Sequence, residues 1–272
     1  MNTRAVIFPF DLFGSGGTRA GAELLADALR EMLADNRREK VATRARAYAG
    51  KVRIEEYTFD RLEDYNGWRE TAQKEARTAL DRGDFLLWIT GNHLGALPVY
   101  DVLSGADTAV VLFDAHLDVY NLSDCSTELS HGNFLLHCAG PLPRIVNVGH
   151  RDLLLRPEYV GKHLHRTFDA AGLAIDPGPA LKEVAVLTAA AKRVFIDVDC
   201  DVLDPAYFPA SAHPQPPGIS PALFLRFLDA AWSGTACGLA ISEFDPARDV
   251  NDRSLATLIW LLEYVLLRLY EK

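Results

Sequence analysis

Two kinds of hydrophobic pattern alternate along the chain. Short runs of consecutive apolar residues predict buried strands, and stretches in which apolar residues recur every three or four positions predict amphipathic helices. We expect strands at residues 5–10, 52–59, 84–89, 109–113, 144–148, 193–198 and 237–242. We expect helices at residues 19–36, 68–80, 94–103, 134–138, 180–191, 221–232 and 255–270, with Ser220 and Asp252 as N-caps of the last two.

The regular alternation of strand and helix predicts the fold class. Repeated βα units imply an α/β protein with a three-layer α/β/α architecture, in which helices cover both faces of a mainly parallel sheet. With 272 residues, 49% of them hydrophobic, the chain can bury one large core, so we expect residues 1–272 to form a single domain. In such sheets the ligand site lies at the carboxyl ends of the strands.

Charge and cysteine content narrow the possible partners. The net charge of -9 argues against nucleic acid or an anionic membrane as a partner and leaves room for a cationic substrate. The 4 cysteines form no C-x-x-C pair, so we expect a cytoplasmic protein with buried, unpaired cysteines. The apolar segment 255–270 contains Glu263 and Arg268 and is too short to cross a bilayer, which leaves a packed helix or a contact in a homo-oligomer.

Polar residues with metal-binding side chains follow the strand at 109–113. Asp114, His116 and Asp118 alternate with apolar residues, so a continued extended backbone would place all of them on one face. Buried carboxylates are rarely left without a counter-ion. Both a metal ion and a salt-bridged strand end are compatible with this triplet alone.

A second cluster of acids follows the strand at 193–198. Asp197, Asp199, Asp201 and Asp204 lie within one short stretch, and the only nearby cations are Lys192 and Arg193. Divalent cations could neutralise such a cluster. Carboxylate and imidazole ligands without a thiolate favour Mn²⁺, with Fe²⁺ or Co²⁺ possible. His93, after the strand at 84–89, offers a further imidazole, although a histidine in this position is by itself more often an ordinary hydrogen-bonded residue.

A glycine-rich loop follows the first predicted strand. Residues 11–18, DLFGSGGT, contain three glycines that could cradle an anion. Their spacing matches neither the phosphate-binding P-loop nor the dinucleotide-binding motif. A plain turn is therefore the favoured interpretation.

Taken together, the strand-end motifs resemble the arginase and agmatinase (ureohydrolase) superfamily. The resemblance is carried by GNH at 91–93, DAHLD at 114–118, DVDCDVLDP at 197–205 and EFDP at 243–246, in this order. It implies an arginase-like fold and a hydrolase with two Mn²⁺ ions. GNH departs from the usual GGDH of the family, which affects the expected packing of that loop.

The resemblance also implies a role for each residue of the motifs. His93 and Asp118 would bind one metal ion, and His116 and Asp201 the other. Asp114 and Asp199 would bridge both ions. Asp197, where the family commonly has Ser, would support a ligand, and Asp204 would turn the chain before Pro205. Two such ions lower the pKa of a water molecule so that hydroxide exists near neutral pH.

Two further residues match family positions that handle the substrate. Glu243 corresponds to the glutamate that hydrogen-bonds a guanidinium, a planar group that pairs bidentately with a carboxylate. His131 stands at the family position of a histidine that carries a proton to the leaving amine, a role that suits a group titrating near neutral pH. The alternative interpretations are that Glu243 is an exposed acid at the end of a strand and that His131 is a structural histidine.

Departures from the family pattern bear on the substrate. Where arginases that act on the free amino acid bind its α-carboxylate, this chain has Tyr120, Thr127 and Leu129. Where they bind the α-amino group, Asp152 is followed by Leu153 and Leu154. Buried polar groups without partners are strongly disfavoured, so free L-arginine is expected to be a poor substrate.

The resulting hypothesis is a peptide arginase that converts arginine residues of a peptide to ornithine and urea, with Tyr120, His131 and Glu243 contacting the substrate. An agmatinase-like enzyme, or one for another small guanidino compound, is the alternative. A non-catalytic metal-binding scaffold is a third possibility, against which the complete set of ligands argues.

Overall fold

A single parallel sheet forms the centre of the molecule. The computed structural model describes residues 1–123 and 125–271. Its 8 strands pair in the order β2-β1-β3-β8-β7-β4-β5-β6, and every pairing is parallel. The strands are β1 (Thr3–Phe8), β2 (Val52–Glu56), β3 (Phe85–Thr90), β4 (Thr108–Phe113), β5 (Arg144–His150), β6 (Arg166–Asp169), β7 (Arg193–Asp199) and β8 (Ala236–Ser242).

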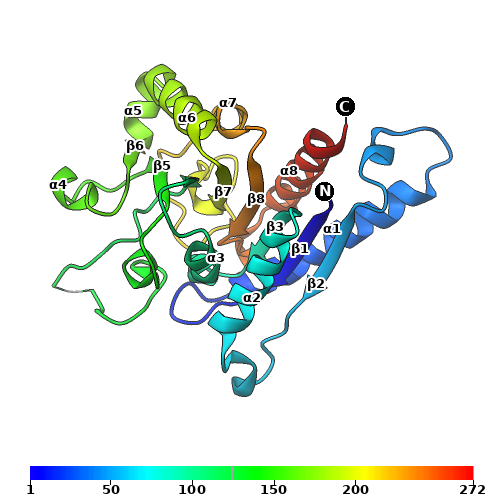
Figure 1. Ribbon diagram of the computed structural model, residues 1–272, viewed down its shortest axis with the longest axis horizontal. Coiled ribbons are helices and arrows are strands. Elements are labelled where there is room, and N and C mark those ends of the chain that lie inside the picture. The colour runs from blue at the N-terminus through cyan, green and yellow to red at the C-terminus, as the bar shows by residue number, and fades with distance from the viewer. Residues whose placement is uncertain (124, 272) are drawn as a thin grey trace.

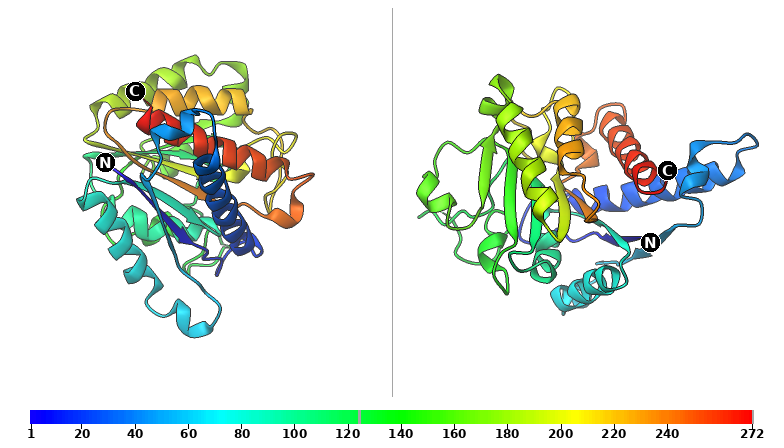
Figure 2. Two further views of the ribbon diagram at one scale, coloured as in Figure 1. Left: turned by 90° about the vertical axis from the view of Figure 1, so that its right-hand side faces the viewer. Right: turned by 45° about the horizontal axis from the view of Figure 1, so that its top comes forward.

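Helices cover both faces of this sheet (Figures 1 and 2). The α-helices are α1 (Thr18–Arg38), α2 (Trp68–Asp81), α3 (Leu97–Val102), α4 (Pro157–Val160), α5 (Ala170–Ile175), α6 (Gly178–Ala190), α7 (Pro221–Ala231) and α8 (Arg253–Tyr270). Short 3-10 turns include η3 (His93–Ala96), η4 (Phe134–His137) and η5 (Cys200–Val202). The three-layer α/β/α fold with a parallel sheet is therefore confirmed.

Alternating side chains of the strands build two separate cores. In β4, Val111 and Phe113 pack with α1, α5, α6, α7 and α8 on one face. Val110 and Leu112 point to the opposite face, where they pack with α2 and α3. Every residue of β4 is buried, which explains why its sequence is a nearly continuous run of apolar residues and does not alternate between apolar and polar residues.

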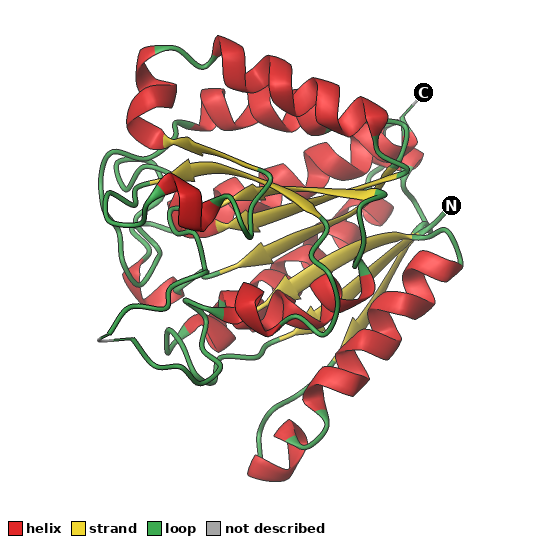
Figure 3. Cartoon of the chain, turned by 60° about the vertical axis from the view of Figure 1, so that its left-hand side comes forward, coloured by secondary structure: helices red, strands yellow, loops and turns green. Residues whose placement is uncertain are grey.

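Parallel pairing also decides where the site can form. The strands point in one direction, and the long loops gather at their carboxyl ends (Figure 3). β3, β8, β7 and β4 are consecutive neighbours in the middle of the sheet. Side chains that follow these four strands are therefore brought to one edge, although they come from distant parts of the sequence.

The sequence-based expectations miss one region. Between residues 157 and 175 the structure contains α4, β6 and α5, none of which we predict. β6 is an edge strand of 4 residues, Arg166 and Asp169 at its ends are exposed, and it lacks an apolar run. α5 is also short, with 6 residues, and its N-cap is Asp169, whose side chain accepts a hydrogen bond from the Gly172 amide.

One predicted helix cap is right and the other is wrong. Ser220 caps α7 as expected, because its side chain accepts a hydrogen bond from the Leu223 amide. Asp252 precedes α8 with φ 53°, and its side chain makes no capping hydrogen bond within the described chain. Asp249 does this instead, since its carboxylate accepts from the amides of Ser254 and Leu255 at 3.0 Å each.

The cysteine prediction is also only partly right. Cys200 is buried, whereas Cys125, Cys138 and Cys237 are half-buried. Among residues 1–123 and 125–271, none of the helices combines the length and the apolar character that a membrane crossing requires.

Candidate metal centre and surrounding cavity

Acids and histidines from neighbouring strand ends converge at the carboxyl edge of the sheet. His93 begins η3 directly after β3, and the segment from Asp114 to Asp118 follows β4. Asp197 and Asp199 end β7, and Asp201 lies in η5. The structure thus brings together the six predicted ligands, namely His93, Asp114, His116, Asp118, Asp199 and Asp201. Their roles as ligands stay predictions.

The expected geometry of the D-x-H-x-D segment is wrong. β4 ends at Phe113, so the three polar residues do not alternate along an extended strand. Asp118 has φ 50°, a left-handed conformation in which non-glycine residues are uncommon. The chain therefore turns after Asp114, and this turn rather than strand alternation brings Asp118 over His93.

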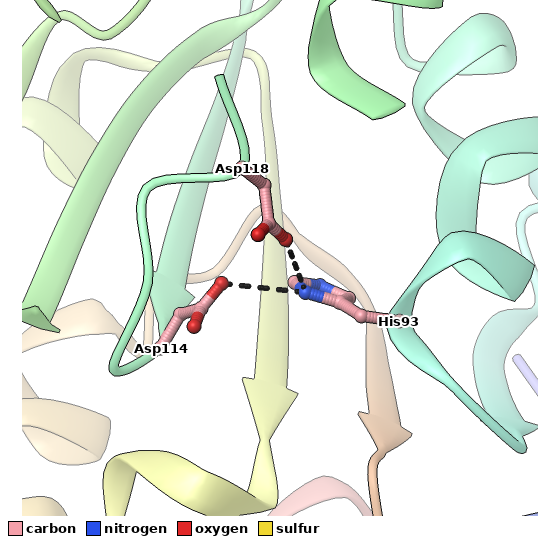
Figure 4. A group of neighbouring side chains, drawn as sticks. All are labelled: His93, Asp114 and Asp118. Atoms are coloured by element: carbon pink, nitrogen blue, oxygen red, sulfur yellow. Dashed lines mark ion pairs between the residues drawn. The ribbon is translucent and has the colours of Figure 1, made fainter. Parts of the chain in front are cut away.

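His93 is the centre of the buried part of the cluster (Figure 4). Its Nδ1 atom lies 2.8 Å from Asp118 Oδ2 and 3.3 Å from Asp114 Oδ2. Asp199 Oδ2 is also 3.3 Å away. Nevertheless, Nδ1 of His93 and Oδ2 of Asp114 form no hydrogen bond within the described chain, although both atoms are buried. Buried polar atoms that converge without bonding each other are unusual and need an explanation.

A second group shares Asp114 with the first. His116 Nδ1 lies 3.0 Å from Asp201 Oδ2 and 3.6 Å from Asp114 Oδ1. The His116 side chain is 41% exposed, so it faces the opening of the site, whereas Asp114 is fully buried. Both groups, His93 with Asp114 and Asp118 and Asp114 with His116 and Asp201, are arranged so that each could hold one metal ion.

The electrostatics of the cluster reflect crowding of buried charges. Burial and the neighbouring Asp114 charge raise the pKa of Asp118 to about 6. Burial disfavours the charged form of His116, but the nearby carboxylates of Asp114 and Asp201 outweigh it and raise the pKa of His116 to about 12. In the same way, Asp197 and the other acids raise the pKa of His93 well above its usual range, although burial opposes this. Concentrated negative charge is thus the dominant feature here.

This donor set fits divalent metal ions. The unpartnered Nδ1 of His93 and Oδ2 of Asp114 converge inside the cluster, where a cation would satisfy both atoms. Imidazole nitrogen and carboxylate oxygen are ligands that Mn²⁺, Fe²⁺ and Co²⁺ accept. A divalent cation would also balance the excess of carboxylates, which would otherwise be buried without sufficient counter-charge.

Asp197 holds His93 from behind. Its Oδ2 lies 3.1 Å from His93 Nε2 and accepts a hydrogen bond of 2.8 Å from the Tyr100 hydroxyl. A carboxylate in this position fixes the orientation of a metal-binding imidazole and makes the other ring nitrogen a stronger metal ligand. Asp204 turns the chain as its position suggests, since it accepts hydrogen bonds from the amides of Ala206 and Gly218.

Glu243 and His131 lie against each other beside the cluster. Glu243 follows β8 with φ 61°, a strained backbone conformation for this residue type. Its Oε1 accepts a hydrogen bond of 3.0 Å from the His93 amide and lies 3.3 Å from His131 Nδ1. The Glu243 carboxylate raises the pKa of His131 although burial opposes this. Glu243 is buried, so it is not an exposed strand-end acid.

A cavity of about 310 Å³ opens above these residues. Its lining includes five of the six predicted ligands together with His131 and Glu243, whereas Asp114 lies beneath them. Sequence reasoning missed the other polar residues of the wall, Ser15 and His213. Ser15 belongs to the glycine-rich loop, which was a detectable signal. His213 lies in an irregular segment that offered no pattern.

Tyr120 lies at the wall of the cavity and links it to a neighbouring surface. Burial, together with the negative charge of the nearby Asp152 carboxylate, raises the pKa of Tyr120. Asp152 accepts hydrogen bonds from the amides of Leu154 and Leu155. In this turn the Leu153 side chain is 98% exposed and Leu154 is 68% exposed. An adjoining hollow of about 500 Å³ is lined by Leu117, Asp152, Leu153 and Leu155 among others.

Comparison with known proteins shows to which family this chain belongs. The model of the arginase family matches residues 3–267, and the chain belongs to this family. A mitochondrial arginase from Medicago truncatula is 29% identical over 181 residues, which cover 61% of this chain and 50% of the relative. The chain therefore spans about half the length of this relative.

Agmatinases and solved structures show a similar likeness. An agmatinase from Proteus mirabilis is 25% identical over 253 residues, which cover 90% of this chain and 79% of the relative. The crystal structure of an arginase from Bacillus subtilis matches with a TM-score of 0.78 at 20% identity and covers 98% of both chains. A hypothetical agmatinase from Burkholderia thailandensis matches with a TM-score of 0.77 at 20% identity and covers 98% of this chain and 86% of its own. These structures confirm the fold.

Proposed function

We propose that the protein is a ureohydrolase with two Mn²⁺ ions that removes urea from arginine residues of a peptide and leaves ornithine. The observation that carries the hydrolase part is the pair of ligand groups that share Asp114 beneath a cavity containing Glu243 and His131. Fe²⁺ or Co²⁺ could occupy the same ligands. When bound, two such ions supply hydroxide near neutral pH.

The residues around the cluster would place the guanidinium. Glu243 lies at the cavity wall, where its carboxylate can accept two parallel N–H bonds from a planar guanidinium. This pairing would hold the central carbon in a fixed position over the ligand cluster. The positive charge of the guanidinium also suits a cavity lined by acids.

His131 would donate the proton that the leaving group needs. Its imidazole lines the same cavity, and Nδ1 faces Glu243. The carboxylate favours the protonated ring, so His131 can hold a proton and deliver it to the departing ornithine amine. Among the described residues, no other histidine side chain of the wall forms an ion pair with Glu243.

The surroundings of Tyr120 support a peptide substrate. An enzyme for the free amino acid needs polar groups for its α-carboxylate and α-amino group, whereas this wall presents the aromatic ring of Tyr120. Leu153 and Leu154 project into solvent in the turn after Asp152, whose charge acts on Tyr120. Exposed apolar side chains next to a cavity favour a ligand that extends past the reacting group and covers them.

Agmatine is the alternative substrate that a specific observation favours. Agmatine carries no α-carboxylate, so a wall with Tyr120 in place of a partner for that group would accept it as well. In addition, the chain is similar to proteins named agmatinase, and the match to one of them covers 90% of this chain.

Urea release distinguishes these substrates. We expect the protein with Mn²⁺ to release urea from an arginine-containing peptide, and mass spectrometry to show the loss of CN₂H₂ for each converted residue. Free L-arginine should be turned over poorly. If agmatine is consumed efficiently while a panel of arginine peptides stays intact, the peptide assignment is wrong. If metal analysis finds an empty site in the Mn²⁺-treated protein, the hydrolase assignment fails as well.

A further inference from the structure

The glycine-rich loop at residues 11–18 lies against the candidate site, although it contributes no metal ligand. Ser15 lines the cavity together with His131 and Glu243. The His131 amide donates a hydrogen bond of 3.1 Å to the Phe13 carbonyl oxygen. The loop is therefore attached directly to the residue that would carry the proton.

Asn92 attaches the same loop to the metal-binding side. Its side-chain Nδ2 donates a hydrogen bond of 2.9 Å to the Leu12 carbonyl oxygen, and its backbone amide donates to the Phe10 carbonyl oxygen at the same distance. Asn92 is completely buried and directly precedes His93. An aspartate here, as in the usual GGDH pattern, would have no N–H to donate to Leu12 and would repel its carbonyl oxygen. The departure from that pattern thus matches a contact made by this chain.

Gly14 is the point where the loop touches both partners. A methyl group on Gly14 would lie 2.6 Å from Asn92 Nδ2 and 2.8 Å from Cγ of the His131 ring. These separations are far below van der Waals contact, so any larger residue would push the loop, Asn92 or His131 aside. Gly16 in the same loop differs, because no described atom outside its immediate neighbours lies within 4 Å of the corresponding methyl position.

We propose that the loop at residues 11–18 positions His131. Asn92 holds the loop in place, and glycine at residue 14 lets the loop pack directly against the imidazole. The loop acts through His131 and does not itself perform a chemical step. The role of His131 in proton transfer rests on the proposed function, whereas the coupling between loop and histidine does not. This gives the glycine motif a purpose other than anion binding.

The first test compares Gly14→Ala with the matched control Gly16→Ala in the full-length, Mn²⁺-loaded protein. Hydrogen–deuterium exchange followed by mass spectrometry reports on backbone amides without any turnover. We expect Gly14→Ala to raise exchange both in residues 11–18 and in the segment around His131, because the bond from the His131 amide to Phe13 is lost. Gly16→Ala should resemble the wild type. Faster exchange in the loop alone, or equal effects of both variants, would overturn the proposal.

A kinetic comparison tests the consequence for catalysis. Small misplacements of a catalytic group cost up to about a hundredfold in rate, so we expect Gly14→Ala to lower kcat by about tenfold while KM changes by less than about twofold. Asn92→Asp should act in the same direction. Metal content must equal that of the wild type, since a loss of metal would show that the effect runs through His93 instead. If the wild type releases no urea, the proposed function fails, and the exchange measurement alone decides this inference.

Discussion

The floor and the mouth of the cavity are built in opposite ways. The floor consists of the six predicted ligands, which are charged or ionisable side chains held at the ends of β3, β4 and β7. By the mouth we mean Tyr120 at the cavity wall together with the exposed Leu153 and Leu154 in the turn after Asp152, all of which belong to loops. Rigid strand ends fix the chemistry that the site can perform, whereas the loops determine which molecule reaches it. A substitution in the floor should therefore affect every substrate, and one in the mouth only some.

The largest effect is expected from Asp114→Asn. Asp114 belongs to both ligand groups and is completely buried, so the loss of its charge weakens both. Changes behind a ligand already cost ten- to hundredfold in metal affinity, so replacing a shared ligand should cost more than about a hundredfold. Metal content after dialysis and urea release should fall together for peptide and agmatine alike.

Asp204→Asn is the matched control for Asp114→Asn. Asp204 follows β7 and η5, and its side chain accepts hydrogen bonds from the backbone amides of Ala206 and Gly218. We expect it to lower the thermal stability and to retain the metal. If Asp114→Asn binds metal as the wild type does, the floor is not a metal site.

Glu243→Gln should separate binding of metal from turnover. The amide oxygen can still accept the hydrogen bond from the His93 amide, so the fold of the floor should persist. The negative charge that would meet a guanidinium is lost, and charge-assisted bidentate pairs are the strong ones. We expect kcat/KM to fall by about a hundredfold, comparable to the loss of one donor in an oxyanion hole. A parallel metal analysis should find wild-type content, and a loss of metal would assign Glu243 to the floor instead of to the substrate.

Asp197→Asn tests whether metal binding at the floor depends on the carboxylate that lies against His93. Asp197 Oδ2 faces both His93 Nε2 and the Tyr100 hydroxyl, so the amide oxygen of an asparagine could keep both contacts, but the negative charge behind His93 would be lost. We expect metal affinity to fall by about ten- to hundredfold, as for other carboxylates behind a metal-bound histidine. Tyr100→Phe keeps the Asp197 contact to His93 and should cost less in a metal titration followed by calorimetry. Equal affinities of wild type and Asp197→Asn would show that His93 needs no such support.

Most of the floor could be predicted from the sequence, because metal ligands and strands both leave strong local patterns. Apolar runs that end in acids located β4 and β7 and their carboxyl ends. The left-handed turn at Asp118 could not be predicted, since it results from packing of the loop over His93 and leaves no periodicity. Likewise, Asp249 rather than Asp252 caps α8, because the backbone at Asp252 directs its side chain elsewhere.

The mouth was harder to predict, because its parts are assembled from segments without regular structure. Tyr120 is recognised from its place after DAHLD, but its proximity to the charge of Asp152 brings together two loops that are distant in sequence. Ser15 and His213 reach the cavity from two further loops. α4, β6 and α5, which adjoin the hollow beside Leu153, are too short for their patterns to stand out. Loop contacts depend on the finished fold, whereas strand ends are placed by the sheet itself.

The smallest effect, and the most selective one, is expected from the double variant Leu153→Ser with Leu154→Ser. Both side chains are largely exposed, so their replacement should leave stability and metal content unchanged. A peptide that covers them would lose part of the favourable burial of two leucines, which should raise KM for an arginine peptide by about tenfold. Agmatine is too short to cover the mouth and the floor together, so its kinetics should not change. If both substrates respond equally, or neither does, the mouth does not select the peptide, and the division between floor and mouth is wrong.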